Sequence, residues 1–179
     1  MAKQLRMQST SGFTLIGLIT VITISAIALP PMMIGFNAWL DSAHQAERME
    51  SAVQLAVDMM DEILAKDFCD PAYGYGSFGT GWDEDERIEY DDVDDYHGWS
   101  ASPPEDFNGA VLNAYQGFTR SVAVENVTGT LPNIGQSASP GTTAYKRITV
   151  RIDWGGAFIT IEALKVYFDD QYYYYLPGS

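Results

Sequence analysis

The feature that most constrains this chain is a long stretch near its N-terminus without a charged side chain. After Arg6, the next Asp, Glu, Lys or Arg is Asp41. A short polar leader ends at Gly12, and a mostly apolar run begins abruptly at Phe13. An apolar segment that starts directly after a cleavage site stays on the mature protein, whereas an ordinary secretory signal is removed. The Gly12–Phe13 junction therefore predicts both a processing site and a membrane destination.

The apolar run is long enough to cross a membrane if it continues past two prolines. Residues 13–29 give a helix of about 25 Å at roughly 1.5 Å per residue, slightly short of a full span. Continuation to Leu40 gives ample length, although Pro30 and Pro31 remove two backbone donors and predict a kink or local melting. We therefore assign residues 1–12 as a leader and residues 13–40 as a transmembrane helix.

Residues 41–67 are predicted to continue the same helix into water. Apolar residues recur there at intervals of three and four, which indicates an amphipathic helix. The predicted stripe consists of Ala46, Met49, Val53, Ala56, Met60 and Ile63. We expect this stripe to pack on the protein's own globular domain, residues 68–179.

The globular domain begins with a long loop region and ends in strands. Residues 83–95 contain nine acidic side chains, with little periodicity around them. Strand patterns follow at 118–124, 145–152 and 158–166, the last two joined by a tight turn at Gly155 and Gly156. The predicted fold class is α+β, with one long N-terminal helix on a small antiparallel sheet.

Charge and cysteine content exclude some classes of function. The net charge is −14, and removal of Lys3 and Arg6 with the leader leaves 8 basic against 24 acidic residues, or −16. Such an acidic body does not bind nucleic acid by neutralising phosphates, and anionic lipid repels it outside its anchor. Cys69 is the only cysteine, so it stays reduced or pairs between chains.

The acidic run offers a candidate metal site. Asp91, Asp92, Asp94 and Asp95 carry the hard oxygen ligands that Ca²⁺ prefers. Their spacing differs from that of a helix-loop-helix calcium loop, and a solvated acidic loop is the alternative interpretation. The only histidines, His44 and His97, do not form a catalytic constellation with other groups. We therefore expect no enzymatic activity and no cofactor other than calcium.

Two motifs resemble known families. Gly12 followed by Phe13-Thr14-Leu15-Ile16 resembles the prepilin-type signature of type IV pilins and type II secretion pseudopilins, Gly-Phe-Thr-Leu-Ile-Glu, at five of its six positions. Segments 61–66, 90–98 and 115–122 resemble the group of minor pilins typified by protein D of the mannose-sensitive haemagglutinin pilus. The resemblance implies a pilin-like fold, cleavage after Gly12 by a prepilin peptidase and N-methylation of Phe13.

The chain departs from the family pattern at Gly17, where the family has Glu. In the family that carboxylate neutralises the methylated amino terminus of a neighbouring subunit, and an unpaired buried charge costs several kcal/mol. The departure therefore implies a minor subunit that initiates or caps the filament, not the repeating one. The implied partners are other pilins or pseudopilins and an inner-membrane assembly platform. The implied location is the bacterial inner membrane, then a periplasmic or cell-surface filament.

Two other interpretations remain open. Ala26-Ile27-Ala28 fits a signal peptidase site, which would release a soluble protein that starts at Leu29. Alternatively, the chain is an adhesive or binding module displayed on a filament, with the aromatic-rich loop 73–99 and the tail 172–175 as its surface. The sequence leaves open which pilus or secretion system the protein would serve.

Overall fold

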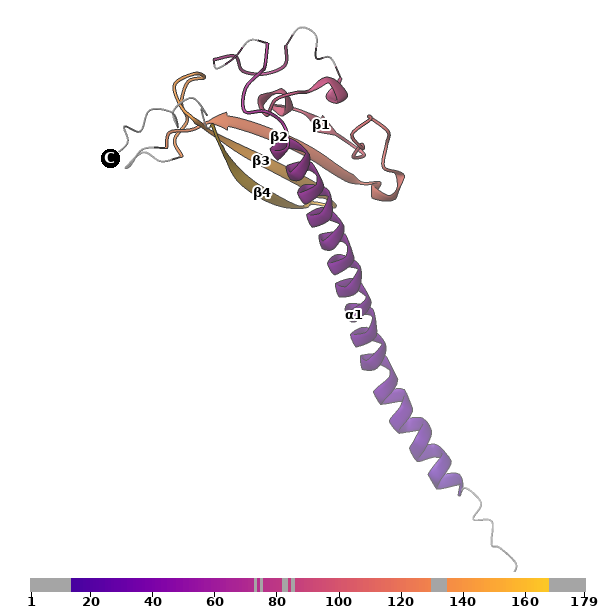
Figure 1. Ribbon diagram of the computed structural model, residues 1–179. Coiled ribbons are helices and arrows are strands. Elements are labelled where there is room, and N and C mark those ends of the chain that lie inside the picture. The colour runs from indigo at the N-terminus through magenta and orange to yellow at the C-terminus, as the bar shows by residue number, and fades with distance from the viewer. Residues whose placement is uncertain are drawn as a thin grey trace, which may run out of the picture. The chain divides into compact units, whose positions relative to one another are not determined.

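The computed structural model describes residues 14–72, 74, 76–81, 84, 86–129 and 135–167. The chain divides into two compact units, Met1–Glu47 and Arg48–Ser179. The boundary falls within a single helix, α1 (Leu15–Leu64), which Figure 1 labels together with the four strands of the second unit. The prediction of one long N-terminal helix beside an antiparallel sheet is confirmed.

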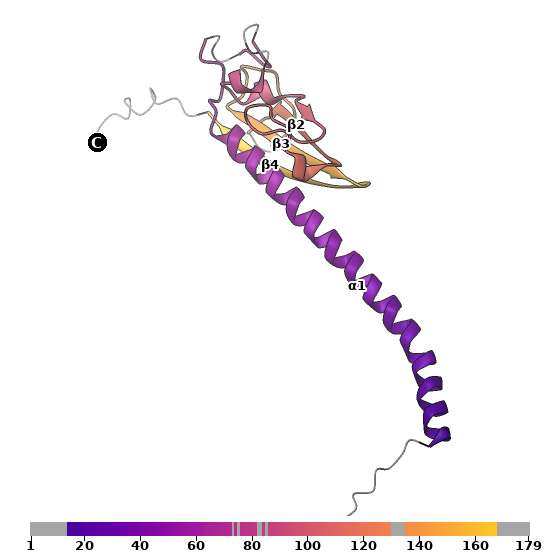
Figure 2. The same ribbon diagram turned by 90° about the vertical axis from the view of Figure 1, so that its right-hand side faces the viewer.

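In the first unit, α1 begins directly after Thr14. The Gly17 backbone N–H donates to Thr14 Oγ1 at 3.3 Å, which is the hydrogen bond of a helix N-cap. Pro30 and Pro31 lie inside the helix, so of the two predicted outcomes, a kink or local melting, the structure has no melting there. Each proline removes one backbone N–H donor, while the turns on both sides keep their hydrogen bonds. A bend of the helix is then sufficient to relieve the clash between the proline ring and the carbonyl of the preceding turn. Figure 2 shows that the N-terminal part of α1 is bent.

The described part of the first unit presents its apolar side chains outward. From Thr14 to Glu47 no described residue is buried, and Ile16 is 76% exposed. The hydroxyls of Thr20 and Thr23 donate to the carbonyls of Ile16 and Ile19 at 2.8 and 2.9 Å, so they are satisfied without water. By length and composition this helix can cross a membrane, which is compatible with a membrane anchor or a signal sequence.

The second unit contains a four-stranded antiparallel sheet in the order β1-β2-β3-β4. Its strands are β1 (Ser100–Ala101), β2 (Phe118–Asn126), β3 (Tyr145–Trp154) and β4 (Ala157–Val166). The three strands predicted from sequence are confirmed. β1 lies in the region predicted as loop, because two residues are too few to show an alternating pattern.

The turn between β3 and β4 follows from its two glycines. Trp154 pairs with Ala157, which leaves Gly155 and Gly156 as the two central residues of the hairpin. Their φ angles are +53° and +86°, a left-handed region that other residues enter only with strain. Two positive φ values in a two-residue loop match the twist of the flanking strands, so this turn sets the register of the hairpin.

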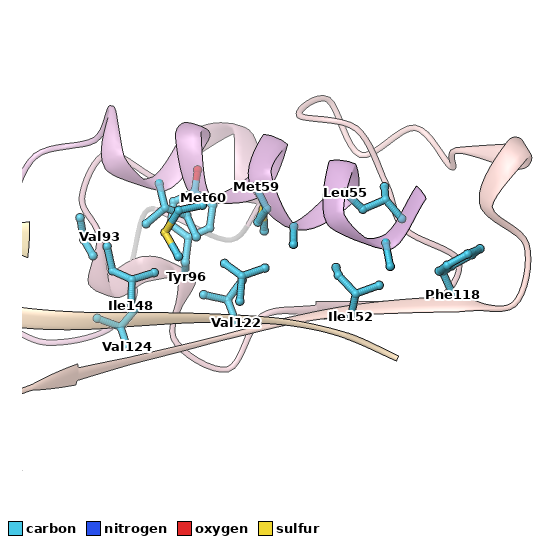
Figure 3. Close-up of a cluster of buried hydrophobic side chains, with 14 residues drawn as sticks. Leu55, Met59, Met60, Val93, Tyr96, Phe118, Val122, Val124, Ile148 and Ile152 are labelled. Carbon is cyan, nitrogen blue, oxygen red and sulfur yellow. The ribbon is translucent and has the colours of Figure 1, made fainter. Parts of the chain in front are cut away.

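The hydrophobic core lies between the C-terminal part of α1 and one face of the sheet. Figure 3 shows Leu55, Met59 and Met60 of α1 facing strand residues such as Val122 and Ile152. Along most of β2 and β3 every second side chain is buried on this face, as the period of two predicts, and the apolar ones among them form the core. The buried apolar residues of the cluster are Ala52, Leu55, Ala56, Met59, Met60, Ile63, Val93, Tyr96, Phe118, Val122, Val124, Ile148, Val150 and Ile152.

The predicted stripe on α1 is partly wrong. Ala56, Met60 and Ile63 are buried, but Met49 and Val53 are 47% and 42% exposed. The buried face instead includes three residues outside the stripe, Ala52, Leu55 and Met59. Apolar residues occupy two adjacent rows on this helix, and the sheet covers only one of them. Local periodicity therefore predicts the helix but not the centre of its buried face.

The long loop between α1 and β2 contains short helical turns. They are η1 (Arg87–Glu89), η2 (Asp94–Tyr96) and η3 (Asn113–Tyr115). The loop is tied back to the end of α1, because the Asp67 N–H donates to the Asp91 carbonyl and the Val93 N–H donates to the Asp67 carbonyl, each at 3.1 Å. Val93 and Tyr96 then reach the core. This anchoring fixes the position of the acidic run.

Candidate functional site

The predicted processing and filament positions lie at the start of the chain. Gly12 and Phe13 are outside the described residues, as is the aromatic tail 172–175. Gly17 lies in the first turn of α1 and is partly exposed. Met33 and Phe36 lie further along the same helix, and they contribute with Leu29, Met32 and Asn37 to a shallow apolar groove on it.

Asp94, one of the four calcium candidates, is already paired with a cation. Its carboxylate forms an ion pair with Lys146 Nζ on β3, and both side chains are almost fully buried. Asp94 Oδ2 also accepts the Gly79 N–H at 3.1 Å. Lys146 donates to the Phe68 carbonyl as well, and its Nζ lies 4.6 Å from the centre of the Phe68 ring. Asp94 is therefore a structural partner of Lys146 and is poorly available to a metal.

The other two buried candidates, Asp92 and Asp95, organise the backbone around η2. Asp92 Oδ1 accepts the Asp94 N–H at 2.6 Å, and Asp95 Oδ2 accepts the N–H groups of Asp91 and Asp92 at 3.1 and 3.0 Å. Asp92 and Asp95 are only 1% and 2% exposed. The interpretation of this run as a solvated loop is therefore wrong for Asp92, Asp94 and Asp95, since local capping draws them inward.

A group of three carboxylates lies beside this capped turn. One oxygen each from Glu84, Asp91 and Asp95 lies within 4.8 Å of the other two. Glu84 is buried, and its Oε2 accepts the Gly81 N–H at 2.6 Å, while Asp91 is exposed. None of the ion pairs between described residues includes a member of this group. The sequence prediction included Asp91 and Asp95 but missed Glu84.

Burial, followed by the mutual repulsion of the carboxylates, raises the pKa values of acids in this loop. Burial, with the charges of Asp95 and Asp91, raises the pKa of Glu84 to about 7, although the Gly81 N–H opposes the change. Burial and the neighbouring Asp94 raise the pKa of Asp92 to about 8. Burial is also the main cause of the raised pKa of Asp95. A carboxyl that keeps its proton up to about pH 7 can share it with the neighbouring carboxylate, so a proton or a cation can relieve the repulsion.

A second polar cluster lies between α1 and the loop. Arg87 binds Glu62 of α1 through Nε and Nη2 at 2.8 and 2.5 Å, and the Tyr96 hydroxyl donates to the same carboxylate at 2.8 Å. Burial raises the pKa of Glu62, but these hydrogen bonds and the charges of Arg87 and Arg120 outweigh it, so the pKa is lowered overall. The negative charge of Glu62 is balanced within this cluster by Arg87, and the hydrogen bonds hold the loop against α1.

The remaining candidates have local roles. His97 Nδ1 accepts the Val124 N–H at 3.1 Å, and the His97 ring packs against Phe78 with ring centres 5.2 Å apart. His44 lies 3.8 Å from Glu47, one helical turn away. Burial raises the pKa of the partly exposed Cys69 thiol, which makes it less reactive.

Glu84 was predictable only in part. It belongs to the acidic run 83–95, but it lies seven positions before Asp91, and only the path of the loop brings the two together. Lys146 shares the side of β3 with Ile148, Val150 and Ile152, so the alternation places it on the buried face, but its ion pair with Asp94 was not predicted because a lysine is seldom fully buried. Comparison of the chain with protein-family models, curated proteins and solved structures finds no match in any of the three.

Proposed function

We propose that this chain is a structural minor subunit of a type IV pilus or type II secretion pseudopilus. It is held in the inner membrane by residues 13–40 and then assembled with other pilins or pseudopilins into a filament. The observation that carries the proposal is the continuity of α1. Its N-terminal part is uncharged from Leu15 to Leu40 and outward-facing, while its C-terminal part forms one side of a core.

The exposed apolar helix supports assembly over secretion. A soluble protein that starts at Leu29 would keep Met32, Met33, Ile34 and Trp39 in water, each at least 65% exposed. Such a continuous apolar surface is unfavourable on a soluble monomer. In lipid or among neighbouring apolar helices the same side chains are accommodated, and their contacts supply the driving force for packing.

The lack of a carboxylate at Gly17 supports a rare position in the filament. A repeating subunit would leave the amino terminus of its neighbour unpaired in an apolar interior, which costs several kcal/mol in each interface. A subunit that occurs once, at the start or the tip, avoids repeating that cost. We also propose that a prepilin peptidase cleaves the chain between Gly12 and Phe13 and that Phe13 is then methylated. This processing is what the resemblance of the Gly12–Phe13 junction to the prepilin signature implies.

Intact-mass measurement of the mature protein tests the processing. A chain that begins at N-methylated Phe13 supports the proposal, and one that begins at Leu29 refutes it in favour of a secreted soluble protein. Quantification of the subunit in sheared filaments tests its position. We expect far less of it than of the repeating pilin, and equal amounts would contradict a minor role. If deletion leaves filaments intact but removes their binding to a surface, the adhesive alternative is correct.

A further inference from the structure

The group formed by Glu84, Asp91 and Asp95 has more negative charge than the described protein around it balances. Three carboxylate oxygens from different positions of the loop converge within 4.8 Å. Two lysines reach this loop, but Lys146 is already engaged by Asp94 and the Phe68 carbonyl, and Lys66 by the Tyr90 carbonyl. Like charges at this separation repel strongly where burial limits screening by water. Such an arrangement is stable when a proton or a metal cation lies between the oxygens.

Unpartnered buried oxygens give a second and independent indication of a ligand. Asp95 is 2% exposed and belongs to the group, and its Oδ2 is fully used by two backbone N–H groups. Its Oδ1, however, has no hydrogen-bond partner in the part of the chain that the structure describes, and the same holds for Oδ2 of the adjacent Asp92. Buried carboxylate oxygens almost always have partners, so this pair requires an explanation.

We propose that Glu84, Asp91 and Asp95 form a calcium site that fastens the acidic loop to the end of α1. All three ligands are carboxylates, and hard oxygen ligands select Ca²⁺ or Mg²⁺ over metals that prefer nitrogen or sulfur. Irregular loop geometry favours Ca²⁺, which accepts six to eight oxygens flexibly, over Mg²⁺, which demands a near-ideal octahedron. The exposed Asp91 leaves the site open to solvent, so water completes the coordination.

The site would add a link within the loop to those already made by the Gly79 N–H on Asp94 and by Arg87 on Glu62. Glu84 lies before η1, whereas Asp91 and Asp95 lie around η2, whose backbone is bonded to Asp67 after α1. Calcium would therefore hold the loop before η1 against the core of the globular unit. The proposal does not depend on membership of a filament, and it replaces the set Asp91, Asp92, Asp94 and Asp95 that the sequence predicted.

Calcium titration of the full-length chain in mild detergent tests the proposal. We expect one Ca²⁺ per chain by isothermal titration calorimetry, with a dissociation constant of about 10⁻⁴–10⁻³ M, the range of weak calcium sites in extracellular modules. Millimolar Ca²⁺ should raise the melting temperature relative to a chelator, and the same concentration of Mg²⁺ should raise it less. Absence of binding at 5 mM (about five times the weakest expected constant) would overturn the proposal.

Matched variants separate a built site from diffuse attraction of cations. Asp91→Asn and Glu89→Gln each remove one negative charge from exposed positions in the same run, but Glu89 is outside the group. We expect at least a tenfold weaker affinity for Asp91→Asn and for Asp95→Asn, and little change for Glu89→Gln. Equal effects of Asp91→Asn and Glu89→Gln would refute the site. If Asp95→Asn fails to fold, Asp91→Asn, on an exposed side chain, decides alone.

Discussion

The buried pair formed by Lys146 and Asp94 provides the sharpest test of how the globular unit is held together. Both side chains are at most 2% exposed, and the pair joins β3 to η2 across 52 positions of the sequence. Replacement of Lys146 by Met keeps most of the apolar stem and removes only the ammonium group. Among the residues that the structure describes, the Gly79 N–H, at 3.1 Å from Oδ2, then remains as a hydrogen-bond donor to Asp94, in an interior that excludes water.

The expected loss of stability follows from this geometry. Removal of one partner of a buried ion pair leaves an uncompensated charge and typically costs 3–5 kcal/mol, roughly a third of the stability of a small domain. Arg147→Met is the matched control on the adjacent position of β3, because Arg147 pairs with Glu125 on the exposed face at 34% and 47% exposure. An exposed pair contributes at most about 1 kcal/mol, so the control should remain close to the parent.

Urea unfolding of the full-length chain in detergent, with chelator present, measures both variants. Tryptophan fluorescence reports on the core because Trp154 stacks on Phe118 with ring centres 6.0 Å apart. The double variant Lys146→Met with Asp94→Asn removes both charges and should recover most of the loss. The reasoning is refuted if Lys146→Met costs no more than Arg147→Met, or if the double variant is as unstable as the single one.

Three further predictions concern the core, acid stability and the hairpin. Ile148→Ala should lower the free energy of unfolding by about 2–5 kcal/mol in the same assay, whereas Leu164→Ala, 55% exposed, should change it by about 0.5 kcal/mol or less. Because the pKa of Glu62 is lowered in the folded state, its contribution to the free energy of unfolding is complete above the ordinary pKa of 4.5 and is lost as the pH falls through the folded pKa. Glu62→Gln should therefore weaken the dependence of the free energy of unfolding on pH in this acidic range. Gly156→Ala, at φ +86°, should destabilise by about 1–2 kcal/mol, and an unchanged urea midpoint would contradict the turn assignment.

The sequence by itself determined the elements whose cause is local. The alternation in 145–152 predicted both β3 and the face it buries, because neighbouring side chains on a strand point to opposite sides. Gly155 and Gly156 predicted the hairpin turn, since a two-residue turn of this kind needs a positive φ angle at both positions and glycine adopts it without strain. The uncharged stretch from Leu15 to Leu40 predicted a helix able to cross a membrane, because its composition excludes ordinary solvent-exposed structure.

Only the tertiary structure decided which distant side chains meet. The sequence marked Asp94 and Asp95 equally as acids in one run, yet Asp94 pairs with Lys146 and Asp95 meets Glu84. Likewise, the helix period allowed more than one buried row, and the position of the sheet selected the row with Leu55 and Met59. Local patterns record backbone conformation, whereas these contacts depend on how a long loop returns to the end of α1, and no short-range periodicity encodes that path.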